Sequence, residues 1–156
     1  MTTIENMTEE QWQNQMNDYR QRLATIRIPL EINPGVAKGL LSRIDTFFSE
    51  VRLDLSHLDG RKEYMSSLIR EIERQKAIGS NEMDRKRNAT MSLQNFESND
   101  GSIVNLYEVQ RTLIQRSSYL QGVVDIIAGK QARLITITGV LKLEKDLMPT
   151  SAQQLL

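Results

Sequence analysis

Apolar residues recur at seven-residue spacing in two long stretches of the chain. The upstream series is Ile44, Val51, Leu58, Met65 and Ile72, and the downstream series is Leu106, Leu113, Leu120, Ile127, Leu134 and Leu141. Because an α-helix turns once in about 3.6 residues, every seventh residue returns to nearly the same face. Each series therefore predicts a long helix with an apolar stripe that packs against another helix, as in a coiled coil.

Local signals set the expected limits of these helices. Asn33 suits an N-cap and Pro34 a first helical position, so the first long helix is expected over residues 36–78. A break at Gly79 precedes a short helix over 80–96, and the turn-forming residues 97–102 predict a loop. The second long helix is expected over 103–146, before a polar tail at 147–156. Two helices of similar length predict an antiparallel hairpin, and hence an all-α fold.

The first 25 residues predict a short amphipathic helix. Thr8 and Gln11 have the spacing of a capping box, and the residues on one face are Trp12, Met16, Tyr19 and Leu23. We expect this stripe to dock on the long helices. The alternative is an arm that binds a partner protein, with Trp12 as the anchor.

Residues 26–35 change the pattern, because apolar and polar residues alternate from Ile26 to Ile32. This alternation predicts an extended segment with one apolar face. Pro29 restricts any strand here to a sheet edge, where it could pair with the same segment of a neighbouring subunit. An extended connector is the simpler interpretation.

Composition supports a single helical domain over residues 1–156 that associates with copies of itself. Of the 156 residues, 39% are hydrophobic and 5% aromatic, which suits long helices with narrow apolar stripes better than a large core. A monomer of this kind would be marginally stable, so a homo-oligomer is expected. The chain has no cysteine, no secretory signal and no apolar run near the roughly 18 residues of a membrane span. We therefore expect a soluble, cytoplasmic protein without membrane contact.

The sequence offers little for catalysis. His57 is the single histidine, and no glycine-rich phosphate-binding motif is present. Nearby acidic residues such as Glu71 and Glu73 are two apart and so point to different sides of a helix. We expect no enzyme, no metal and no cofactor.

A basic cluster is the remaining candidate site. The chain has no net charge, but residues 61–95 hold eight basic and five acidic side chains. Candidate contacts to nucleic-acid phosphates are Arg70, Arg74, Lys76, Arg85, Lys86 and Arg87 around Gly79, with Lys130 and Arg133 on the second long helix. Nearby aromatic residues that could stack on bases are few: Phe96, Tyr107 and Tyr119. An ordinary solvated helix face explains the cluster equally simply.

The order of these features resembles one known family. A long helix ends in a basic E-x-x-R-x-K stretch (residues 71–76), and after Gly79 come an acidic-basic run (81–87) and a leucine-rich second helix (119–144). This layout is similar to that of phage recombination mediators of the UvsY type. The resemblance implies a ring-like oligomer in which Arg74 and Lys76, and then Arg85, Lys86 and Arg87, contact single-stranded DNA. It also implies a RecA-like recombinase as partner, which the mediator helps to replace single-strand binding protein on DNA.

Three functions follow as hypotheses. The first is such a mediator, in the host cytoplasm if the chain is phage-encoded. The second is a virion structural or assembly protein that uses its apolar stripes to bind other copies. The third is a small inhibitor or adaptor that binds a host protein through the segment around Trp12.

Overall fold

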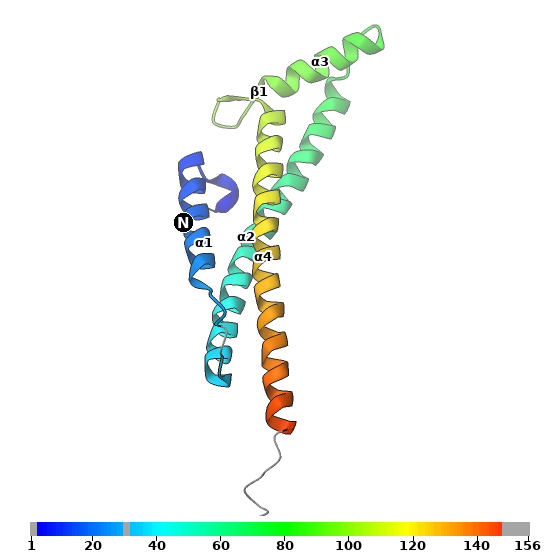
Figure 1. Cartoon of the computed structure of the whole chain (residues 1–156). Coiled ribbons are helices and arrows are strands. Elements are labelled where there is room, and N and C mark those ends of the chain that lie inside the picture. Colours follow the sequence, from blue (N-terminus) through cyan, green and yellow to red (C-terminus); the bar gives the residue numbers. More distant parts are fainter. Residues whose placement is uncertain (1–2, 30–31, 148–156) are drawn as a thin grey trace, which may run out of the picture. The chain divides into compact units, whose positions relative to one another are not determined.

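The computed structural model describes residues 3–29 and 32–147, which form two compact units. The first unit comprises residues 3–7 and 53–121, and the second comprises residues 8–29, 32–52 and 122–147. In chain order, Figure 1 shows a 3₁₀ helix η1 (Ile4–Asn6), α1 (Glu9–Thr25), α2 (Pro34–Lys76), α3 (Glu82–Gln94), the strands β1 (Phe96–Glu97) and β2 (Ile103–Val104), and α4 (Leu106–Leu147). The predicted all-α class with two long paired helices is confirmed. A single domain over the whole chain stays a prediction.

In the first unit, residues 53–76 of α2 pair with residues 106–121 of α4. The Ser117 hydroxyl donates to Asp59 at 2.7 Å, and the Tyr107 hydroxyl donates to Glu73 at 3.3 Å. Asp59 precedes Glu73 on α2, whereas the partner of Asp59, Ser117, follows Tyr107 on α4. The two segments are therefore antiparallel. Lys62 also donates to Asp59, at 2.6 Å. The hydrogen bonds from Lys62 and Ser117 lower the pKa of Asp59.

The N-terminal helix α1 begins at Glu9, directly after the cap residue that the sequence predicts. The Thr8 hydroxyl accepts from the Gln11 amide at 3.3 Å, and the Gln11 side chain accepts from the Thr8 amide at 3.0 Å. This is the predicted capping box, and it fixes where the helix starts. The preceding η1 belongs to the first unit, where Arg116 donates to the Met7 carbonyl oxygen at 3.0 Å and Ile4 is buried.

The expected loop over 97–102 is the turn of a small β-hairpin. Strands β1 and β2 pair antiparallel, with Phe96 opposite Val104. Gly101 has a φ of 80°, a left-handed conformation that favours glycine. The Asn105 side chain accepts from the Tyr107 amide at 3.1 Å and caps the next helix. The second long helix therefore begins at Leu106, three residues later than predicted.

The second unit contains α1, residues 34–52 of α2 and residues 122–147 of α4. The ring of Tyr19 on α1 meets that of Phe47 on α2 edge-on, with 5.5 Å between centroids. On the α4 side, Gln131 donates to Asp45 of α2 at 2.6 Å. As predicted, Trp12, Met16 and Tyr19 are buried on one face of α1.

The segment between α1 and α2 has no regular secondary structure at residues 26–29 and 32–33. Leu30 and Glu31 lie outside the described residues, as do residues 148–156 of the predicted tail. Ile26 and Ile32 are buried, so the described part has an apolar side. The Val36 amide donates to the Asn33 side chain at 2.9 Å, and α2 begins at Pro34.

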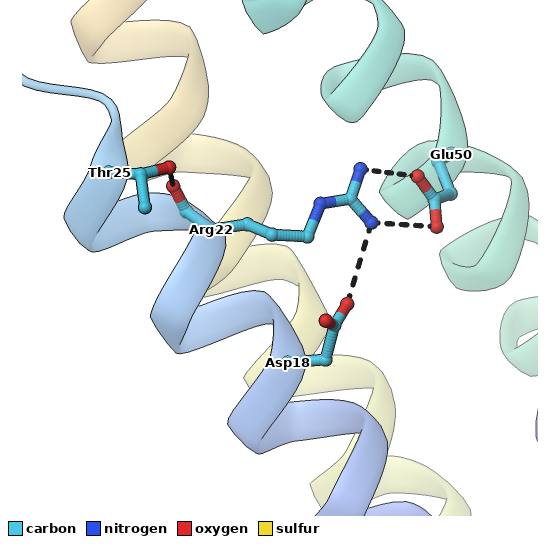
Figure 2. Close-up of polar contacts among 4 residues, drawn as sticks. All are labelled: Asp18, Arg22, Thr25 and Glu50. Atoms are coloured by element: carbon cyan, nitrogen blue, oxygen red, sulfur yellow. Dashed lines mark hydrogen bonds and ion pairs between the residues drawn. The ribbon is translucent and has the colours of Figure 1, made fainter.

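An arginine of α1 joins α1 to α2 through polar contacts (Figure 2). Arg22 donates to the two carboxylate oxygens of Glu50 at 2.9 and 2.6 Å and pairs with Asp18 at 3.5 Å. Its guanidinium also lies 4.2 Å from the centre of the Phe47 ring. The hydrogen bond from Arg22 lowers the pKa of Glu50. This bidentate geometry fixes the orientation of the Arg22 guanidinium relative to the Glu50 carboxylate.

The seven-residue stripes coincide with the interior. Among the ten stripe residues from Ile44 to Ile72 and from Leu106 to Leu134, the exposed fraction never exceeds 8%. Leu141 is half-buried. Among the described helices, none is long and apolar enough to cross a membrane.

Candidate nucleic-acid interface

Six of the predicted basic residues lie at the junction of α2 and α3 in the first unit, which we call the basic end: Arg70, Arg74, Lys76, Arg85, Lys86 and Arg87. All six are exposed to solvent. Figure 1 shows the chain turning sharply between the end of α2 and the start of α3, and the two groups of three bases flank this short connection.

A tight turn makes this connection. The Asn88 side chain donates to the Ile78 carbonyl oxygen at 2.6 Å, and the Asn81 side chain caps α3 by accepting from the Asp84 amide at 2.9 Å. At Gly79 a Cβ atom would come within 2.7 Å of the Asp84 Cβ, which real Cβ atoms do not tolerate. The glycine lets the turn fold back on the first turn of α3 and so keeps both basic groups at one end of the unit.

Acidic residues interleave with these bases, but most are already engaged. Glu71 pairs with Arg74 at 3.3 Å, Asp84 accepts from Ser80 at 2.8 Å, and Glu73 accepts from Tyr107. Burial, followed by the charge of Glu73, raises the pKa of Tyr107.

Five of the six bases keep their charge available, because only Arg74 has a carboxylate partner. Across residues 3–29 and 32–147, no carboxylate forms an ion pair within 4.0 Å with these residues: Arg70, Lys76, Arg85, Lys86 and Arg87. Three of them are consecutive on α3 and so spread over roughly half of the helix circumference. The first half of α3 thus presents positive charge on several sides.

An aromatic cleft of about 410 Å³ lies in the same unit, between α2, the β-hairpin and α4. Tyr64 and Phe96 line it, and Tyr64 is 56% exposed. The Arg61 guanidinium lies 5.2 Å from the centre of the Tyr64 ring, and Asn99 from the hairpin turn completes the polar side. Such a cleft offers a ring face for stacking and polar groups for base edges.

Sequence reasoning named Phe96 but missed Tyr64 and Arg61. Ten residues of α2 separate Tyr64 from Arg74, which is about 15 Å along the helix axis. The three-residue spacing of Arg61 and Tyr64 on a helix was the available signal. Their meeting with Phe96 depends on the β-hairpin, which the sequence did not predict.

Two predicted bases do not belong to the basic end, because Lys130 and Arg133 lie on α4 in the second unit. Lys130 donates to the Ile26 carbonyl oxygen at 2.8 Å and is half-buried, whereas Arg133 is exposed. The sequence grouped all eight bases, but the structure assigns them to separate units.

The structure gives no support to Trp12 or His57 as functional residues. Trp12 is buried, with an exposed fraction of 6%, so it is no exposed anchor for a host protein. His57 is exposed on α2. Within the described ranges, no cluster of three or more potential ligands could hold a metal ion.

Comparison of the chain with protein-family models, with curated proteins and with solved structures gives no match. The similarity to UvsY-type mediators stays a prediction.

Proposed function

We propose that this protein is a non-enzymatic homo-oligomer that holds single-stranded DNA and acts as a phage-type recombination mediator. A RecA-like recombinase is its proposed protein partner, and the host cytoplasm its proposed location. The observation that supports this most is the set of bases without carboxylate partners at the basic end. Cations that no protein group neutralises are available to phosphates, whose binding releases condensed counterions.

The aromatic cleft adds a second element of single-strand recognition. Bases in a single strand expose their ring faces, and stacking on an aromatic side chain contributes about 1–3 kcal/mol per base. Tyr64 and Phe96 belong to the same unit as the bases of the basic end. Phosphate contacts and base contacts are therefore both within reach of one short strand.

Oligomerisation is part of the proposal because each subunit offers few contacts. Linked binding sites act on one strand at high effective concentration, so a weak patch repeated in an oligomer binds far more tightly than one copy. This explains how a chain without net charge could retain DNA.

The test is fluorescence anisotropy of a labelled oligothymidylate of about 30 nucleotides, titrated with protein at low salt. The triple variant Arg85→Ala, Lys86→Ala and Arg87→Ala should weaken binding by about tenfold or more, because three phosphate contacts are lost. All three side chains are exposed, so circular dichroism should show an unchanged helix content.

A matched control removes the same charge elsewhere. Lys38, Lys142 and Lys145 are exposed lysines of the second unit, and their replacement by alanine should leave binding nearly unchanged. An equal loss in both triple variants would show that bulk charge alone governs binding. Absence of any retention at low salt would refute the proposal.

A second candidate, an assembly protein, is favoured by a separate observation. Ile135, Val140 and Leu143 of α4 are large apolar residues, and each is about half exposed or more. Such side chains suit contact with another copy. Mass measurement in solution separates the two functions: a mediator assembles and binds the oligonucleotide, whereas an assembly protein forms the same complexes with DNA present or absent.

A further inference from the structure

A second cleft, of about 410 Å³, lies in the second unit between the α1–α2 segment and α4. We call it the α4 cleft and define it by Arg27, Ile28, Ile126, Gly129, Lys130 and Arg133. The two arginines and Lys130 bring three positive charges to one hollow. Their distance in sequence, about a hundred residues, hides this from any reading of the chain alone.

The positions of the α4 residues follow from helix geometry. Ile126, Lys130 and Arg133 are spaced i, i+4 and i+7 and therefore share one face. Lys130 is held in place by its bond to the Ile26 carbonyl oxygen at 2.8 Å. A carbonyl group is neutral, so this bond orients the ammonium group and leaves its charge in the cleft. Gly129 adds no side chain, and a Cβ there would meet nothing within 4 Å.

The chemistry of the lining is mixed. Ile126 is 54% exposed and Ile28 half-buried, so apolar surface lies beside the cations. Among the described residues that line the α4 cleft, none is acidic and none is aromatic. Asp125, the nearest acidic residue along α4, is not one of them.

We propose that the α4 cleft binds an acidic peptide segment of a partner protein, in which carboxylates alternate with aliphatic or aromatic side chains. Arginines bind carboxylates in bidentate geometry, and isoleucines provide the apolar contact that anchors such a segment. A nucleic-acid strand fits less well, because no ring is present on which a base could stack. This site lies outside the basic end and does not depend on DNA binding there.

The probe is a fluorescein-labelled peptide of about ten residues that alternates Asp with Ile and Phe, titrated into the full chain. A second peptide with Ser in place of Ile and Phe has the same charge and measures the electrostatic part alone. We expect the apolar peptide to bind at least about tenfold more tightly than its serine counterpart, since burying one or two such side chains supplies that difference.

Variants of the cleft then locate the site. Arg27→Ala combined with Arg133→Ala should weaken the apolar peptide by about tenfold or more. Ile126→Ser should weaken the apolar peptide and leave the serine peptide unchanged. Both arginines and Ile126 are exposed, so the fold should persist. Lys142→Ala, another exposed cation of α4, is the matched control and should change neither peptide.

Several results would overturn the proposal. Equal affinity for the two peptides would remove the apolar contact, and full binding by the double arginine variant would place the peptide elsewhere. If oligothymidylate binds and loses affinity in the double arginine variant while the peptides fail to bind, the α4 cleft belongs to nucleic acid. The triple variant of the basic end should bind the apolar peptide normally, which keeps this test separate from that of the proposed function.

Discussion

Two leucines of the same helix provide a direct test of the apolar stripe. Leu58 and Leu53 both lie in the part of α2 that belongs to the first unit, but Leu58 is 0% exposed and Leu53 is 60% exposed. Replacement of each by alanine makes the same chemical change at a stripe position and at an off-stripe position. Alanine is also a good helix former, so neither change penalises the helix itself.

The expected magnitudes follow from burial. Leu58→Ala removes three fully buried carbon atoms, which costs about 2.4 kcal/mol in transfer free energy, and the cavity left behind raises the loss to about 3–4 kcal/mol. Leu53→Ala removes carbons that are mostly in water already, so its cost is about 1 kcal/mol or less. A loss of 3 kcal/mol is a large part of the roughly 5–15 kcal/mol that stabilises a typical domain.

The assay is urea unfolding followed by circular dichroism of the helices at several protein concentrations. The midpoint should fall clearly in Leu58→Ala and little in Leu53→Ala, with the same dependence on urea in both. In a thermal scan, 3 kcal/mol corresponds to about 6–12 °C for a chain of this size. If the two variants lose the same stability at every protein concentration, burial along the seven-residue stripe does not govern this helix pair.

Further outcomes follow from single contacts. Glu50→Gln should cost about 0.5–1 kcal/mol at pH 7, a value already reduced for solvent screening of this half-exposed pair. Because Arg22 lowers the pKa of Glu50, the ionised carboxylate stabilises the fold at pH values above the usual carboxyl pKa near 4.5. The difference in unfolding free energy between Glu50→Gln and the parent chain should therefore shrink as the urea titrations move to lower pH. Gly79→Ala should destabilise by about 1–2 kcal/mol since its Cβ would clash near Asp84, whereas Gly122→Ala in open space on α4 should stabilise by about 0.5–1 kcal/mol in the same titration. Ser117→Ala should cost about 1 kcal/mol through its lost bond to a carboxylate, checked by thermal unfolding.

The helical stripes were predictable because helix geometry alone dictates their period. Residues such as Val51 and Leu120 repeat at seven-residue spacing whatever they pack against, and both prove to be buried. Helix starts were predictable where a cap was visible, as at Thr8 and Asn33. Asn105 was overlooked, although its side chain is what starts α4 at Leu106.

The candidate sites were predictable only in part, because a helical period reports a face and not its neighbours. The bases of the basic end are close in sequence, so a local reading could find them. Arg27 reaches the α4 cleft through the packing of the α1–α2 segment, and Tyr64 meets Phe96 through a two-residue strand pair. Two-residue strands carry almost no periodic signal, and contacts between distant segments depend on the register of the packed helices.

Salt dependence connects the two parts of the proposed function, DNA binding and self-association. The basic end offers five bases without ion pairs, and for a single strand each neutralised phosphate adds about −0.7 to the slope of log affinity against log salt. One subunit should therefore show a slope of about −3.5, which is a loss of about 130-fold between 50 and 200 mM salt. A slope steeper than about −4, the value for all six bases of the basic end, requires contacts from beyond that end, such as those of a second subunit on the same strand. If the slope steepens at protein concentrations where the measured mass rises, the same association that buries apolar surface also multiplies the phosphate contacts.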